Sequence, residues 1–156
     1  MYKLALLVAL SVVLYGCGGG SNDGSTQSST PESAAKATDA GKGIGEIKHV
    51  ELNNPLDPAM VKRGEGIYQM KCAACHKLTD QRVVGPGWAG ITSKRQPEWI
   101  MNMTTNVDVM LEQDPVAREL LKECLVRMPN QNLSIGDARD VLELMYKNDG
   151  VPVADQ

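Results

Sequence analysis

Five consecutive residues, Cys72-Ala73-Ala74-Cys75-His76, constrain this chain more than any other part of its sequence. Two thiols separated by two residues and followed by an imidazole form the C-x-x-C-H pattern through which a c-type haem is attached. On one helical turn, both thiols can form thioethers with one haem, and the histidine can bind the iron as its proximal ligand. We therefore predict one covalent haem c, held by Cys72 and Cys75, with His76 on the iron.

Three other kinds of site could use the same cysteines. A thioredoxin-like dithiol requires a βαβ setting, whereas the surrounding sequence has a helical pattern. A zinc site requires a second pair of ligands, and only Cys124 and His49 remain, singly and far away. A disulfide between Cys72 and Cys75 leaves His76 without a role. We favour haem attachment, and interpret His49 as a surface residue and Cys124 as a small buried hydrophobe.

The chain is short of large core side chains. Its 156 residues include two tryptophans, four tyrosines and no phenylalanine. Tyr2 and Tyr15 lie in an N-terminal segment that resembles a removable signal. A domain of roughly 100 residues buries only about 60–65% of its unfolded surface and is marginally stable without help. The composition excludes a large enzyme, and we expect the porphyrin to supply core volume, so that the haem-free protein is largely unfolded.

The first seventeen residues have the pattern of an export signal. A positive start at Lys3 is followed by an apolar run over residues 4–14, which is too short to span a membrane as a helix. Cys17 directly follows this segment and resembles the lipidated cysteine of bacterial lipoproteins, although Tyr15 departs from the usual pattern. We predict a lipoprotein signal peptide at residues 1–16 and lipidation of Cys17. The alternative is an ordinary signal peptide that leaves Cys17 free.

The next segment, residues 17–56, is predicted to be the lipidated cysteine and a flexible linker. Residues 18–45 are rich in Gly and Ser and contain almost nothing that could build a core. Residues 44–54 are less polar and could pack as an irregular lead-in. The protein would then be exported and lipid-anchored to a membrane that faces the periplasm or the cell exterior. Residues 57–150 form the predicted haem domain.

This domain resembles the class I c-type cytochromes, in particular small bacterial mono-haem cytochromes c. The resemblance implies an all-α, cytochrome c-like fold wrapped around one covalent haem. Asp57-Pro58 supplies an N-cap and an N1 proline for a helix that we expect to run to about residue 71. In the family, a small residue and an aromatic at the positions of Gly64 and Tyr68 let the first helix cross the last one closely.

The resemblance also implies contacts to the haem. The carbonyl of Pro86 would accept a hydrogen bond from the second ring nitrogen of His76, unless Pro86 is a plain turn proline. Arg95 and Trp99, at a predicted helix start, resemble residues that bind haem propionates. Trp99 could instead be a core residue, and we expect Trp88 to pack against the haem edge.

A class I cytochrome completes its iron with a methionine sulfur, and we predict Met128. It follows a helix expected over residues 115–125, and Pro129 directly after it prevents regular helix. Residues 134–137 then form a capping-box-like start for the last helix. Met101 and Met103 are the alternatives, since most methionines are core filler.

These features imply a membrane-tethered one-electron carrier rather than an enzyme, because His/Met ligation leaves the iron without an open site. Implied partners are a quinol-oxidising complex upstream and a terminal oxidase or anaerobic reductase downstream. Two alternatives stay open: a gas sensor with five-coordinate haem, and a fixed haem subunit of a larger oxidoreductase complex. No nucleophile, base or substrate pocket can be identified from the sequence.

Charge is segregated along the domain. Residues 58–150 carry twelve basic and twelve acidic side chains, and no uniformly basic block indicates nucleic-acid binding. Residues 62–95 carry seven bases and two acids, and residues 98–123 carry six acids and two bases. If the basic side surrounds the haem edge, we expect an acidic docking surface on the partner and association that weakens with salt.

Overall fold

The computed structural model describes residues 41–124 and 126–155. The described chain is helical, with no named strand and two isolated bridges, one of which joins Leu56 to Val153. No helix among these residues has the length and apolar character needed to cross a membrane. The predicted signal peptide, Cys17 and the linker up to residue 40 lie outside the described residues.

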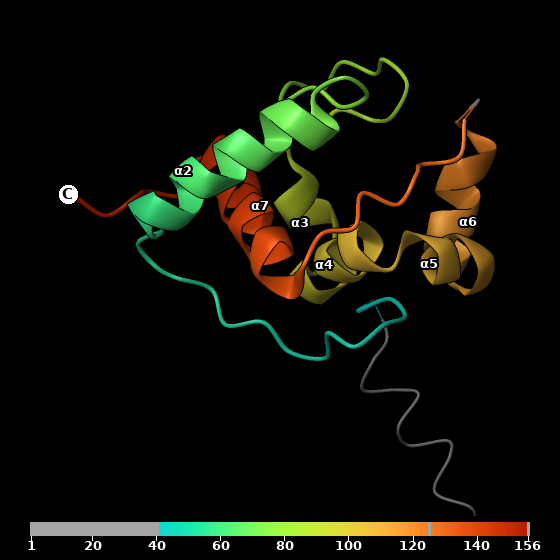
Figure 1. Ribbon diagram of the computed structural model, residues 1–156, viewed down its shortest axis with the longest axis horizontal. Coiled ribbons are helices and arrows are strands. Elements are labelled where there is room, and N and C mark those ends of the chain that lie inside the picture. Colours follow the sequence, from blue (N-terminus) through green and yellow to red (C-terminus); the bar gives the residue numbers. More distant parts are fainter. Residues whose placement is uncertain (1–40, 125, 156) are drawn as a thin grey trace, which may run out of the picture. The chain divides into compact units, whose positions relative to one another are not determined.

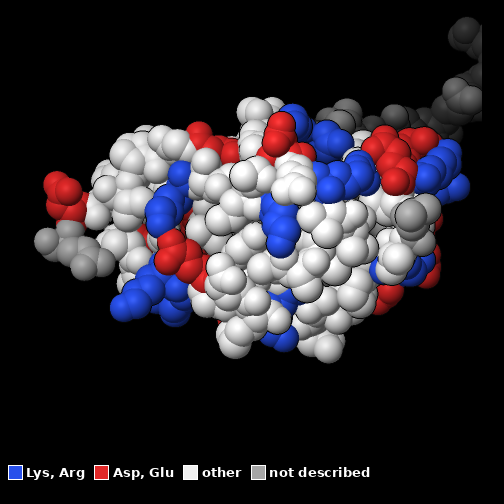
Figure 2. Space-filling view, turned by 90° about the horizontal axis from the view of Figure 1, so that it is seen from above, with Lys and Arg blue, Asp and Glu red and all other residues white. Residues whose placement is uncertain are grey.

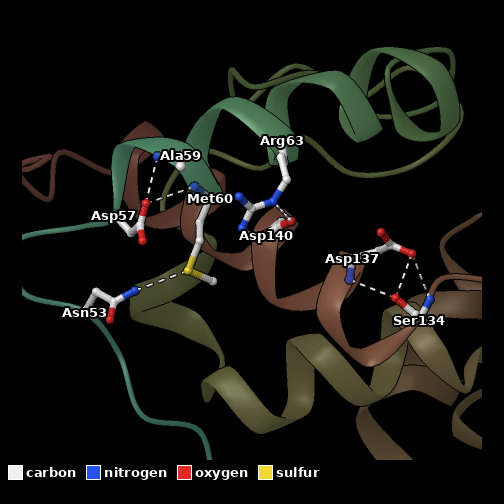
Figure 3. Close-up of polar contacts among 8 residues, drawn as sticks. All are labelled: Asn53, Asp57, Ala59, Met60, Arg63, Ser134, Asp137 and Asp140. Carbon is white, nitrogen blue, oxygen red and sulfur yellow. Dashed lines mark hydrogen bonds and ion pairs between the residues drawn. The ribbon is translucent and has the colours of Figure 1, made fainter. Parts of the chain in front are cut away.

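Helices α2 (Pro58–Ile67) and α7 (Ile135–Asn148) form the most extensive contact between helices (Figure 1). Gly64 lies at their crossing, where a Cβ atom would come within 2.2 Å of the backbone oxygen of Asp140. Arg63 closes the crossing with two hydrogen bonds, of 2.7 and 2.8 Å, to the Asp140 carboxylate (Figure 3). The expected close approach of the first and last helices at Gly64 is therefore confirmed.

Three of the predicted helix starts are capped as expected. The Asp57 carboxylate accepts hydrogen bonds from the backbone of the first turn of α2, and Asp114 does the same for α6 (Pro115–Lys122). Ser134 and Asp137 form a reciprocal capping box at the start of α7 (Figure 3). The predicted extension of α6 to residue 125 is wrong, since α6 ends at Lys122 and residue 125 is not described.

The helix that leads into Cys72 does not stay α-helical to residue 71. It changes at Tyr68 into a π-helical turn, η1 (Tyr68–Cys72), in which the Ala73 N–H donates to the Tyr68 carbonyl. The Tyr68 hydroxyl donates to the His76 carbonyl at 2.9 Å, and its buried ring lies 5.1 Å from that of Trp88. A π turn inserts one residue relative to an α-helix, and these tertiary contacts stabilise it.

Three short helices follow η1 and precede α6 in the chain: α3 (Ile91–Lys94), α4 (Pro97–Thr105) and α5 (Val107–Gln113). Helix α4 packs against α7, and α5 packs against both α4 and α6. Asp149, just after α7, accepts hydrogen bonds from the backbone of Gly90 and from both the backbone and hydroxyl of Thr92. These contacts hold the start of α3 against the end of α7.

Residues 41–56, here called the strap, pack onto the helices instead of extending the flexible linker to residue 56. Ile47 and Leu56 are buried. The fully buried Asn102 of α4 accepts a hydrogen bond from the Ile47 N–H and donates to the carbonyls of Ile47 and Lys42. Buried Glu143 of α7 accepts from the Asp57 N–H at 2.9 Å. Buried side chains thus form hydrogen bonds with backbone groups of the strap, which has no regular secondary structure to pair them.

Candidate haem site

An apolar pocket of about 990 Å³, including its open mouth, lies among residues 75–76, the 84–88 loop, helices α3 to α7 and the segment between α6 and α7. Its lining is mainly apolar, with Ile91, Ile100, Leu111 and Leu121 among the contributors, and Thr104 and Arg127 are among its few polar members. A large cavity lined by apolar side chains with a few placed polar groups is typical of a small-molecule or cofactor site. Among the described residues, no three His, Cys, Asp or Glu side chains cluster to form a metal site of their own.

The two cysteines of the C-x-x-C-H motif lie at the end of η1. Cys72 is buried and Cys75 is half-buried and lines the pocket. Both are free thiols, so the structure does not contain the disulfide considered as an alternative. Burial raises the pKa of the Cys72 thiol to about 11, which keeps it neutral at ordinary pH. The pair is placed where a haem in the pocket could be held.

His76 lines the pocket, and its orientation is fixed from outside. Its Nδ1 lies 2.8 Å from the Pro86 carbonyl oxygen, which can only accept, so the proton is on Nδ1 and Nε2 carries the lone pair. Burial lowers the pKa of His76, partly opposed by this hydrogen bond, and the imidazole is therefore favoured in its neutral form. A neutral imidazole with one nitrogen oriented by a carbonyl is the form that ligates iron.

Neighbouring residues pack closely around the His76 ring. A Cβ atom at Gly85 would lie 2.3 Å from His76 Cε1, so only glycine fits there without displacing the imidazole. On another side, the Trp88 ring centroid lies 5.6 Å from that of His76. The contact with Pro86 that the resemblance implied is present, and its role toward haem stays a prediction.

Met128 lines the same pocket from the segment between α6 and α7. Of the alternatives, Met103 also contributes to the lining, whereas Met101 is buried in the core and does not. Met110 is fully buried and its sulfur accepts a hydrogen bond from the Ile44 N–H. The pocket therefore brings the sulfur-bearing side chain of Met128 together with His76, and Met103 and Met145 are the other methionines among its described lining residues.

Arg95 and Trp99 lie together beside the pocket, with the guanidinium 5.3 Å from the Trp99 ring centroid. The Arg95 Nε is buried without a hydrogen-bond partner among the described residues, and Nη1 of the same guanidinium donates to the Lys94 carbonyl at 2.9 Å. Trp99 lines the pocket, but its indole N–H donates to Asp114 at 3.1 Å. Sequence reasoning missed this bond, because it joins two helices.

The charges near the mouth are paired rather than segregated. Arg82, from the basic stretch, pairs with Glu123 of the acidic stretch at 3.1 Å, and Arg127 pairs with Asp108 of α5 at 3.2 Å. The exposed valines 84 and 126 border the same pocket. Figure 2 shows one face of the molecule, on which basic and acidic side chains are interspersed among uncharged ones. Folding therefore cancels part of the charge separation in the sequence.

Cys124 is half-buried and lines the pocket near its mouth, within 3.5 Å of Arg82 Nη1. The expectation of a buried packing residue did not include this position beside the site. An apolar stripe in the sequence identifies an inward-facing thiol but not the cavity that it faces.

The family model of cytochrome c matches residues 61–147, which is more than half of the chain. The solved cytochrome c from Rhodothermus marinus is 34% identical, with a TM-score of 0.68, and the match covers 72% of this chain and 97% of that one. An engineered cytochrome c from the same organism is 32% identical over 73% of this chain and 96% of that one, with a TM-score of 0.65. A third structure, the engineered protein bound to a carbene intermediate, has the same identity and coverage and a TM-score of 0.63. No curated protein matches the chain.

The family match begins inside α2 and ends inside α7, so it spans the helix crossing, the cysteine pair and the pocket. The apolar lining, the free thiols and the oriented imidazole all fit a covalent haem c, which is the cofactor of this family. The chain belongs to the cytochrome c family.

Proposed function

We propose that this protein is a one-electron carrier in which Cys72 and Cys75 would hold a covalent haem, and His76 and Met128 would bind its iron. The observation that carries the proposal is the composition of the pocket, where one oriented imidazole and the thioether of Met128 meet a mainly apolar lining. Among the described residues, the lining offers no carboxylate that could act as an acid or base on a substrate. When bound, the haem supplies an iron that alternates between the ferrous and ferric states.

The side chains around the pocket prepare it for this role. Pro86 orients His76 through its carbonyl, and Gly85 leaves room for the ring. The hydrophobic walls exclude water, which influences the reduction potential of an enclosed redox centre. The Arg95 guanidinium, which lies over the Trp99 ring, would pair with a propionate.

We further propose that the carrier is exported and attached to a membrane through a lipid on Cys17. The sequence of residues 1–17 supports this proposal, and residues 18–40 would give the domain reach above the membrane. The partners would be a quinol-oxidising complex upstream and a terminal oxidase or anaerobic reductase downstream. Incorporation of radiolabelled palmitate into the wild type and not into Cys17→Ala tests the anchor, and equal labelling of both refutes it.

Visible spectroscopy with added carbon monoxide tests the carrier against the gas sensor. We expect the reduced protein to keep a six-coordinate spectrum, because Met128 occupies the position at which a gas would bind. The oxidised protein should show the weak far-red band that reports an iron–thioether bond. Ready binding of carbon monoxide by the wild type would contradict the proposal and favour a five-coordinate sensor.

The choice of Met128 has its own test with a matched control. Met128→Ala should abolish the far-red band, whereas Met103→Ala, which also removes a methionine from the pocket lining, should retain it. The reverse result would show that Met103 is the ligand.

A last test distinguishes a free carrier from a fixed haem subunit of a larger complex. A fixed subunit would co-purify with its complex from detergent-solubilised membranes at high salt, whereas a shuttle would separate.

A further inference from the structure

The segment that carries Met128 is held to the protein by side chains. We call residues 126–133 the Met128 loop; it has no regular secondary structure. Among these described residues, no backbone–backbone hydrogen bond joins the loop to another element. The main local bond is from the Asn132 N–H to the Asn130 side chain. A loop without backbone pairing opens more readily than the helices beside it, unless other contacts stabilise it.

Arg127, the residue next to Met128, supplies the polar contacts nearest to the methionine. Its Nη2 lies 3.2 Å from Asp108 Oδ1 and 3.6 Å from Glu112 Oε1, and it also donates to the Asp108 carbonyl at 3.4 Å. Asp108 and Glu112 lie four residues apart on α5, so both carboxylates face the same guanidinium. Arg127 also lines the pocket. One side chain thus joins the loop, the pocket wall and α5.

The other attachments lie farther from Met128. Lys71 donates to the Gln131 carbonyl at 3.1 Å, three residues beyond the methionine. Arg82 binds the carboxylate and carbonyl of Glu123, five residues before it. Arg127 is therefore the attachment with the most direct influence on where Met128 lies.

We propose that Arg127 is a positioning residue for the axial methionine, and that its ion pairs with Asp108 and Glu112 act as a salt-sensitive latch. While the latch is closed, Met128 stays in the pocket, and when it opens an external ligand can compete for the same position. This inference rests on the proposed function, because it requires Met128 to be the sixth ligand. The ion pairs are solvent-exposed, with 44% of the Arg127 side chain accessible, so dissolved salt can screen them.

Competition with imidazole in the oxidised holoprotein measures this latch. An exposed ion pair changes an equilibrium by about 1.4- to 5-fold, so losing two pairs should tighten imidazole binding by about 2- to 25-fold in Arg127→Ala at low salt. Arg127→Lys keeps the charge and should recover part of the effect. Arg118→Ala, which removes an exposed arginine of α6, is the control and should bind imidazole as the wild type does.

The double variant Asp108→Asn/Glu112→Gln tests the same latch from α5. It should tighten imidazole binding as Arg127→Ala does, and adding Arg127→Ala to it should change little, because coupled residues are not additive. If Arg127→Ala folds poorly, this double variant still tests the same ion pairs, because it keeps Arg127. At about 1 M salt, where screening acts over about 3 Å, the difference between wild type and variants should nearly vanish.

Equal imidazole affinity in Arg127→Ala and Arg118→Ala would overturn the proposal, as would a difference that persists unchanged at high salt. A failure of the proposed function looks different. In that case the oxidised wild type lacks the far-red band before any imidazole is added. A wild type that has the band, together with variants that show no shift, refutes only the latch.

Discussion

Two glycines of α2 provide a test of the helix crossing, because replacing each by alanine should change the stability of the protein in opposite directions. A Cβ atom at Gly64 would meet the Asp140 backbone oxygen at 2.2 Å and the Leu144 Cβ at 3.2 Å. The first of these neighbours is backbone of α7, so it cannot move aside as a flexible side chain could. At Gly66, an added Cβ atom would meet nothing within 4 Å. Both glycines lie inside the same helix, so the gain in helix propensity from Ala is about 1 kcal/mol for each.

Gly64→Ala must separate two packed helices. Overpacking a core costs about 1–3 kcal/mol, and a clash with backbone belongs at the upper end, so a net destabilisation of about 2 kcal/mol remains after the propensity gain. Gly66→Ala should stabilise the protein by about 0.5–1 kcal/mol. For a domain of this size, 1 kcal/mol shifts the melting temperature by roughly 4–8 °C.

The assay is denaturant and thermal unfolding of the holoprotein, followed by circular dichroism, for wild type and both variants. We expect Gly64→Ala to melt about 8–16 °C below the wild type and Gly66→Ala to melt slightly above it. A Gly64→Ala protein as stable as the wild type would refute the close crossing. Equal destabilisation by both substitutions would show that the effect comes from the helix itself and not from its contact with α7.

Three further predictions concern the strap, the contact between α3 and α7, and the space around His76. Asn102→Ala removes three hydrogen bonds to the strap and should lower the free energy of unfolding by about 2–4 kcal/mol, measured by urea titration, whereas a loss below 0.5 kcal/mol would show that the strap contributes little. Burial raises the pKa of Asp149, but hydrogen bonds from Thr92, Gly90 and Asn148 outweigh it and hold the pKa below the ordinary 3.8. The contribution of this carboxylate to the free energy of unfolding is complete above pH 3.8 and is lost as the pH falls through the lower folded pKa. The wild type should therefore be more stable than Asp149→Asn at higher pH and lose this difference only in acid. A difference between their unfolding curves that does not change with pH contradicts this. Gly85→Ala should displace the His76 ring and lower the haem-to-protein ratio, measured by absorbance; a normal ratio and spectrum would show that the ring tolerates the change.

The parts of the fold that could be predicted from sequence are those that depend on local chemistry. The cap at Asp57, the capping box at Ser134 and the thiol pair use residues close together in the chain, so a short pattern specifies them. The crossing at Gly64 was found through the family resemblance. The lower polarity of residues 44–54 indicated that they could pack, but the role of Asn102 was not found. Its side chain reaches backbone 55 to 60 residues away, and no local pattern distinguishes a buried asparagine with three partners from an exposed one.

The candidate site shows the same division. Cys75, His76 and Met128 were placed by motif and by the proline after Met128, and the structure brings all three to one pocket. The bond from Trp99 to Asp114 and the pairing of Arg127 with α5 were missed. Each depends on how two helices meet, and that geometry follows from packing of the whole domain.

The single π turn at η1 also sets an angle. Each residue advances an α-helix by about 100°. The π turn takes up one extra residue in a wider turn, with the Ala73 N–H bonded to the Tyr68 carbonyl, so the residues after it keep nearly the direction that a helix one residue shorter would give them. A regular α-helix over the same residues would instead turn the cysteine pair by about 100° relative to the Gly64 face of α2. The direction in which the cysteine pair faces therefore depends on this turn, and a variant could keep every side chain of the motif and still present them in the wrong direction.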